Sequence, residues 1–244
     1  DYFKENYLRY ENLVYDPNIR TIIFERYGVQ FSDPVMTLGS SEQLFLSFDD
    51  ISAEYKSLMF TLVHCDASWN PSNLMQNEYL DGFFEERIDN YQYSFNTLQN
   101  YIHYEQVIPG REARPKISGN YLLLVYPEGF PDKPVLTRRM MVLQQEVTVE
   151  AEVDRATVVS LRETHHEIDF SINYPALKVA NPFEDIKVVL RQNNRWDNAH
   201  TEVRPTFFSR NQMEFDTEAD AVFPAGKEWR WLDIRSFRFQ SERV

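Results

Sequence analysis

Hydrophobic and polar residues alternate along much of this chain, as strands with one buried face require. Leu44, Leu46 and Phe48 share one parity, with Phe45, Ser47 and Asp49 between them. The same period of two recurs in residues 147–153, 168–172 and 186–190, where apolar side chains at every second position predict further strands.

Two apolar runs also predict strands. Leu58–Val63 is apolar or Thr throughout, so we expect a strand covered on both faces. Tyr121–Tyr126 lies between turn residues on both sides, and its length indicates a strand rather than a helix. Pro127–Pro134 predicts a hairpin loop, after which Val135–Leu143 resumes a strand. Near the C-terminus, Leu232 and Ile234 share one parity and Phe237 and Phe239 the other, which predicts a bulge at 235–236.

Evidence for helices is thin. Residues 77–87 fit a short helical turn that Gly82 weakens. Many short strands with scarcely a helix between them predict an all-β fold of two antiparallel, immunoglobulin-like β-sandwich domains in tandem. We expect the boundary near residues 143–145, which gives domains 1–143 and 144–244.

The amino-acid composition favours strands and restricts the classes of possible binding partner. Aromatic residues make up 15% of the chain, whereas only 7 of its 244 residues are Gly. The formal net charge of -13 repels phosphate backbones and anionic lipid headgroups, so we expect no nucleic-acid partner. The longest apolar run, Tyr121–Tyr126, is far below the roughly 20 residues of a membrane-spanning helix, so we expect no direct membrane insertion.

Candidate chemistry is sparse. The single Cys65 excludes a disulfide within the chain and every multi-cysteine zinc site. His64, Cys65 and Asp66 contain the residue types of a thiol site, but neighbours on a strand point to opposite faces. We therefore expect Cys65 to be a small buried hydrophobe and Asp66 to begin a turn.

No cofactor site is predicted. The glycines are too widely spaced for a loop that cradles phosphate, and no Gly-x-Ser-x-Gly elbow occurs. His165-His166-Glu167 invites a metal interpretation, but alternation puts only one of the two histidines on the face of Glu167. Acidic pairs occur at Asp49-Asp50 and Glu85-Glu86, and spacing in the sequence alone does not place them across a groove.

An ordered set of segments resembles the plug protein of the type IX secretion system. The matching stretches are residues 16–21, 38–50, 64–69, 78–83, 94–97, 118–123, 137–142 and 192–198. The strongest is Gln192-Asn193-Asn194-Arg195-Trp196-Asp197-Asn198. Each is unspecific alone, but together they run across nearly the whole chain in the family's order.

The resemblance implies a non-enzymatic periplasmic protein, peripheral to the outer membrane. It would bind the large outer-membrane translocon barrel and occlude its periplasmic opening. Family members are longer, so this chain resembles the N-terminal part. No catalytic residue carries over.

Seven residues within the matching segments are candidates for a structural or interaction role: Asp66, Trp69, Arg138, Arg139, Arg195, Trp196 and Asp197. Asp66 is a turn former. One of the two arginines at 138–139 would pair with Asp49 or Asp50. Arg195 would stack its guanidinium on the Trp196 indole.

Two other functions stay open. A carbohydrate-binding module would present exposed, coplanar aromatic rings, for which the candidates are Trp69, Trp196, Trp229 and Trp231. A hydrolase would need a cleft in which two carboxylates of separated pKa converge.

Overall fold

The structure, a computed structural model, describes residues 7–230. Of these residues, 42% lie in strands or β-bridges and 4% in helices, which confirms the predicted all-β class. The chain divides into two compact units, Asp1–Gln144 and Gln145–Val244. No helix among residues 7–230 has the length and apolar character needed to cross a membrane.

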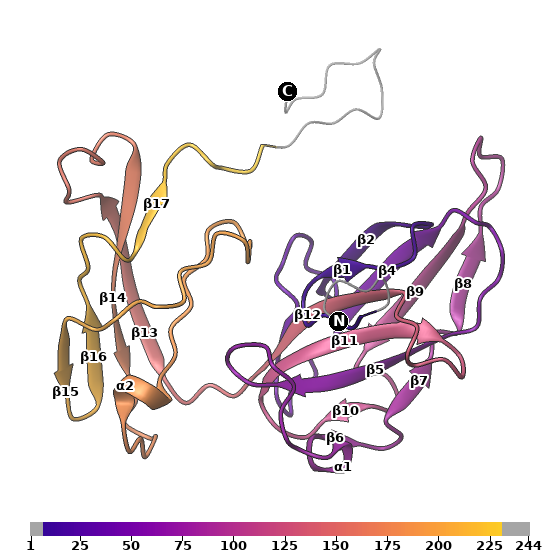
Figure 1. Ribbon diagram of the computed structural model, residues 1–244, viewed down its shortest axis with the longest axis horizontal. Coiled ribbons are helices and arrows are strands. Elements are labelled where there is room, and N and C mark those ends of the chain that lie inside the picture. The colour runs from indigo at the N-terminus through magenta and orange to yellow at the C-terminus, as the bar shows by residue number, and fades with distance from the viewer. Residues whose placement is uncertain (1–6, 231–244) are drawn as a thin grey trace. The chain divides into compact units, whose positions relative to one another are not determined.

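The first unit contains two main sheets (Figure 1). One has the order β1-β12-β11-β5-β7, and β3 also pairs with β12, in parallel. Its strands are β1 (Leu13–Val14), β3 (Val35–Thr37), β5 (Leu58–Cys65), β7 (Glu85–Arg87), β11 (Gly119–Pro127) and β12 (Leu136–Leu143). The other has the order β2-β4-β9-β8, with β2 (Ile19–Arg26), β4 (Leu44–Asp50), β8 (Asn90–Tyr93) and β9 (Ile102–Ile108).

The core of this unit lies between the two sheets. Leu44, Leu46 and Phe48 are fully buried, as the alternation predicts, and pack in one cluster with residues of β5 and β11. Tyr121–Tyr126 forms part of the predicted strand, and every one of its residues is buried, so β11 is covered on both faces. The predicted loop 127–134 joins β11 to β12 in an antiparallel hairpin.

A small two-stranded sheet completes the unit. It pairs β6 (Leu80–Asp81) with β10 (Arg114–Pro115), just after the short helix α1 (Gln76–Tyr79). The expected helical turn is thus one turn long. Gly82 follows β6 with a φ of +81°, a conformation that only glycine adopts without strain, and a Cβ there would lie 2.3 Å from a Glu112 carboxylate oxygen.

In its described residues, 145–230, the second unit is built on a five-stranded sheet. Its strands are β13 (Thr148–Arg155), β14 (His165–Asn173), β15 (Phe207–Ser209), β16 (Gln212–Phe215) and β17 (Val222–Pro224), and its helix is α2 (Pro182–Asp185). Phe170 and Ile172 of β14 pack with Met213 and Phe215 of β16 in a core of six buried side chains.

Two strand predictions in this unit need correction. Residues 186–190 alternate but form no strand; only Leu190 makes a bridge, to His200, and the apolar side chains pack on the core from a loop after α2. β13 is a strand, but its expected buried face is open, with Val149 56% and Val153 59% exposed. A second sandwich stays a prediction, and residues 232–239 lie outside the described part.

Candidate functional site

Asp66 forms a turn directly after β5. One of its carboxylate oxygens accepts hydrogen bonds from the backbone N–H groups of Ser68, at 2.8 Å, and Asn70, at 2.9 Å. The bond from Asn70 is the main reason why the pKa of Asp66 lies below its usual value. Asp66 thus satisfies local backbone groups, as expected.

The same turn positions Trp69 beneath Arg139. Trp69 has a φ of +64° and is only 6% exposed, and the guanidinium carbon of Arg139 lies 4.5 Å from the centre of its ring. Arg139 also donates from Nε to the backbone oxygen of Tyr10, at 2.8 Å. The structure therefore brings together Asp66, Trp69 and Arg139, and it uses them to tie the N-terminal segment to β5 and β12.

The expected ion pair between this arginine pair and Asp49 or Asp50 is wrong. Arg138 Nη1 donates to the backbone oxygens of Leu13, at 3.1 Å, and Thr137, at 2.7 Å. Burial lowers its pKa to about 10. The acids lie on β4, in the other main sheet, where each has a different partner.

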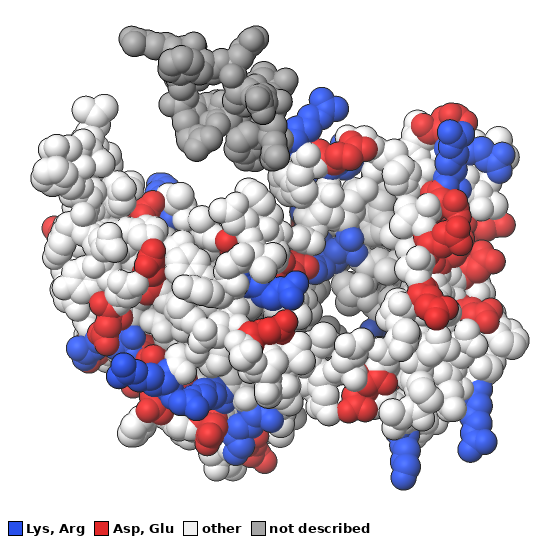
Figure 2. All heavy atoms as spheres, turned by 180° about the vertical axis from the view of Figure 1, so that it is seen from behind, with Lys and Arg blue, Asp and Glu red and all other residues white. Residues whose placement is uncertain are grey.

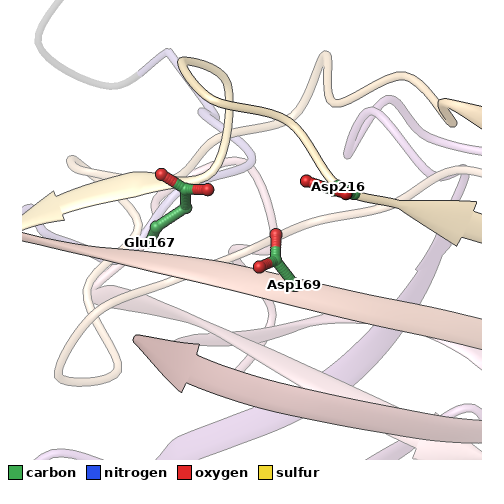
Figure 3. Close-up of side chains that lie close together, drawn as sticks. All are labelled: Glu167, Asp169 and Asp216. Carbon is green, nitrogen blue, oxygen red and sulfur yellow. The ribbon is translucent and has the colours of Figure 1, made fainter. Parts of the chain in front are cut away.

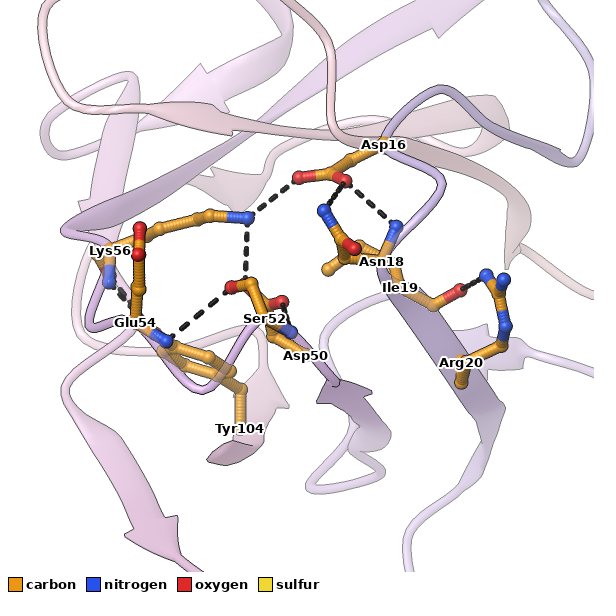
Figure 4. Close-up of polar contacts among 9 residues, drawn as sticks. All are labelled: Asp16, Asn18, Ile19, Arg20, Asp50, Ser52, Glu54, Lys56 and Tyr104. Atoms are coloured by element: carbon orange, nitrogen blue, oxygen red, sulfur yellow. Dashed lines mark hydrogen bonds and ion pairs between the residues drawn. The ribbon is translucent and has the colours of Figure 1, made fainter. Parts of the chain in front are cut away.

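The partner of Asp50 is Lys56, in a partly buried network that the sequence did not predict (Figure 4). Lys56 Nζ lies 2.7 Å from Asp16 Oδ2 and 2.8 Å from Asp50 Oδ2, and the Asp50 side chain has no exposed surface. Burial alone would raise the pKa of Asp16, but the hydrogen bonds from Lys56 and Asn18 hold it below its usual value. The network fixes the loop between β4 and β5, and Tyr104 Oη bonds to the same loop.

In the second unit, the Arg195-Trp196-Asp197 segment is arranged differently from the expectation. Arg195 binds the Asp197 carboxylate with two nitrogens, and Arg191, not Arg195, stacks on the Trp196 ring, at 4.5 Å from its centre. The planar fork of Arg195 matches the carboxylate two residues later, which directs it away from the indole. An interaction role for these residues stays a prediction.

A cluster of carboxylates is the arrangement nearest to a metal site (Figure 3). Oxygens of Glu167, Asp169 and Asp216 lie within 4.8 Å of one another. Asp169 shares a face of β14 with Glu167, and the pairing of Phe170 with Phe215 brings Asp216 beside it. Calcium takes such oxygen ligands, but both oxygens of Glu167 already accept hydrogen bonds from Thr157.

A thiol site at Cys65 finds little support. Burial raises the pKa of Cys65 to about 12, which keeps the thiol protonated and a poor nucleophile.

A sugar-binding site also finds little support. A cavity of about 450 Å³ beside the exposed Trp229 is lined by the amides of Gln192 and Asn193. Those amides donate to the backbone oxygens of Pro224 and Lys227, so they already have partners within the chain.

Trp69 is buried and Trp196 is covered by Arg191, so neither offers an open ring to a sugar. Trp231 lies outside the described residues. The cavity beside Trp229 has one acidic residue, Glu228, and a second cavity, of about 290 Å³, has none. Neither brings two carboxylates together as a hydrolase requires.

Comparison with known proteins identifies the family. The chain resembles a crystal structure of a hypothetical protein from Parabacteroides merdae with a TM-score of 0.87 and 30% sequence identity. The match covers 96% of this chain and 59% of that one. No curated protein matches. The family described as type 9 secretion system plug protein, first domain, matches residues 19–144, over half of the sequence. The chain therefore belongs to the type 9 secretion system plug protein family.

Proposed function

We propose that this chain is the N-terminal part of a non-enzymatic periplasmic plug, which binds the outer-membrane translocon barrel and occludes its periplasmic opening. The observation that carries the proposal is the family match over residues 19–144. That range coincides with the two-sheet unit from the start of β2 to the end of β12.

The build of the first unit suits a steric role. Its two sheets share one close-packed core, and close-packed interiors have low compressibility. The buried Lys56 network and the stacked Arg139 and Trp69 fix its loops to that core. A rigid body of this kind can close an aqueous opening without any reactive group.

The plug must leave when cargo arrives, so the contact should be reversible and largely polar. The net charge of -13 would then act at the rim of the contact, through complementarity with basic loops of the barrel. We expect the association rate to fall as salt is added. An affinity and a rate that are indifferent to ionic strength would contradict an electrostatic rim.

The proposal is tested by affinity capture of the full-length protein from detergent-solubilised outer membranes. We expect one very large barrel protein to be recovered. In a planar bilayer that holds the purified barrel, adding the full-length protein should lower ion conductance, whereas an unrelated β-sandwich protein of similar size should not. Capture of no barrel, or an unchanged conductance, would refute the plug.

A further inference from the structure

The hairpin between β8 and β9 differs in composition from the rest of the chain. Residues 90–102 contain no Asp, Glu, Lys or Arg, although such residues make up 26% of the sequence. Instead, three tyrosines, one phenylalanine, one leucine and several amide and hydroxyl side chains follow one another. A stretch this neutral in a chain of net charge -13 suits contact with an uncharged surface.

The apolar side chains of this hairpin are exposed to solvent. Phe95 is 86% exposed, Tyr93 61%, and Leu98 as exposed as in an extended chain. Figure 1 shows the hairpin projecting past the neighbouring strands of its unit, and in Figure 2 this projecting end, at the upper left, is free of charged side chains. Exposed aromatic side chains that gather at one place often mark a binding site.

The hairpin is held in shape before any partner binds. The backbone of Ser94 donates to the Tyr101 carbonyl and the Ser94 hydroxyl accepts from the Tyr101 N–H, each at 2.9 Å. Gln99 donates from its amide to the backbone oxygen of Ile51, at 3.2 Å, which ties the tip to the loop after β4. Such preorganisation lowers the entropy lost on binding.

A row of aromatic rings connects the hairpin to the core. Tyr91 lies opposite the buried Tyr104 in the strand register, with ring centres 6.0 Å apart, and contacts Tyr93 and Tyr55 at 5.9 and 4.9 Å. Tyr55 precedes Lys56, so the buried ion network also positions this ring. The exposed rings of the hairpin are therefore held in place by contacts that lead to the buried Tyr104.

The strand edge beside these rings is also open. β8 ends the sheet order β2-β4-β9-β8, and its sequence, Asn-Tyr-Gln-Tyr, has no charge and no proline. The edge strands β7 and β13 carry several charges, the usual protection against pairing with another chain. A partner can thus approach β8 closely.

We propose that this hairpin is the part of the plug that docks on its protein partner, with Phe95 and Leu98 entering an apolar, uncharged recess at the periplasmic end of the translocon. The inference rests on the proposed function and names the small apolar centre of its otherwise polar contact. A protein recess fits better than a lipid surface, because the hairpin has no cation to meet anionic headgroups. Tyr, Ser and Asn are also enriched in the antigen-binding loops of antibodies.

The test measures binding of the full-length protein to the purified translocon barrel at low and at high salt. The variant is Phe95→Ser with Leu98→Ser, which touches only exposed side chains and should leave the melting temperature unchanged. The control is Phe31→Ser, because Phe31 is 80% exposed in the loop after β2, at the other end of the same sheet. We expect the double variant to bind at least about 30-fold more weakly at both salt concentrations, and the control to bind as the wild type does.

Four results would overturn the proposal, and they are distinguishable. If the double variant binds the barrel within about twofold of the wild type, docking lies elsewhere and the plug function stands. If the wild type itself does not bind, the plug function fails and the docking site with it. Wild-type binding to phosphatidylcholine–phosphatidylglycerol vesicles that the double variant loses would assign the hairpin to a membrane. A wild-type dimer in sedimentation that the double variant loses would assign it to a second copy of this chain.

Discussion

The two units of this chain bury very different cores. In the first, twenty-two buried residues form one cluster between two sheets. In the described part of the second, residues 145–230, six form the cluster, most of them from β14 and β16 of a single sheet, and every residue of the edge strand β13 is exposed. Because stabilisation grows with the apolar area removed from water, the first unit should be much the more stable. The larger core makes the first unit the better candidate for the proposed blocking role.

The largest loss of stability is expected from a substitution in the small core of the second unit. Phe215 is 2% exposed and stacks on Phe170, with ring centres 4.3 Å apart. We expect Phe215→Ala to cost about 4 kcal/mol of the free energy of unfolding and to unfold the second unit while the first stays folded. Urea unfolding followed by hydrogen exchange measures both units. Loss of both together would show that they unfold as one.

A substitution in the Lys56 ion network tests the stability of the first unit. Lys56→Met leaves the fully buried carboxylate of Asp50 without its cation, and we expect a cost of about 3 kcal/mol. Lys133→Met, which removes an exposed lysine near Phe130, is the control and should change stability by less than about 0.5 kcal/mol. Equal effects of the two variants would mean that solvent reaches Asp50.

A smaller effect is expected where β11 begins. Gly119 has a φ of +147°, and a Cβ there would lie 2.4 Å from Nε2 of His64, which packs against Tyr121. We expect Gly119→Ala to destabilise the first unit by about 2 kcal/mol. In a His64→Ala background the cost should shrink, because the clash is gone. A cost of the same size in both backgrounds would leave backbone strain as its cause.

The smallest expected effect is an increase in the free energy of unfolding of the second unit. Burial, and then the neighbouring Asp216 and Glu167, raise the pKa of Asp169 above its value of 3.8. The folded state therefore holds this proton more tightly than the unfolded state, so this contribution to stability grows as pH falls through the raised pKa and levels off below 3.8. Asp169→Asn should gain up to about 1 kcal/mol at pH 7 and lose that pH dependence. Thermal unfolding across pH 3–7 measures it, and a variant no more stable than the wild type would contradict the repulsion.

Strands were predictable wherever the core was large. Leu44, Leu46 and Phe48 alternate because one face of β4 meets a second sheet, and the pattern records that burial directly. Residues 186–190 carry the same pattern, but there it records only packing of a loop onto a small core. Alternation reports which side chains are buried; pairing with a neighbouring strand is a separate condition.

The side-chain contacts of the candidate residues also divide into those that the sequence predicts and those that only the fold determines. Asp66 was predictable, because a turn former acts on groups two to four residues away. Lys56 was not, since Asp16 lies 40 residues before it and no local signal joins them. The stacking partner of Trp196 was misassigned because two arginines lie near it in the sequence, and only the fold decides which one meets Asp197.

The pairing of β12 has a consequence for biogenesis. This strand is the last of the first unit to be synthesised, and it is hydrogen-bonded to β1, β3 and β11. The first strand, β1, therefore cannot pair until β12 has been made. A chain that emerges from its N-terminus cannot close this sheet until about residue 143 is available, and such long-range pairing folds slowly. Truncated chains that end before Leu136 should remain sensitive to protease, whereas those that pass Gln144 should become resistant in a single step.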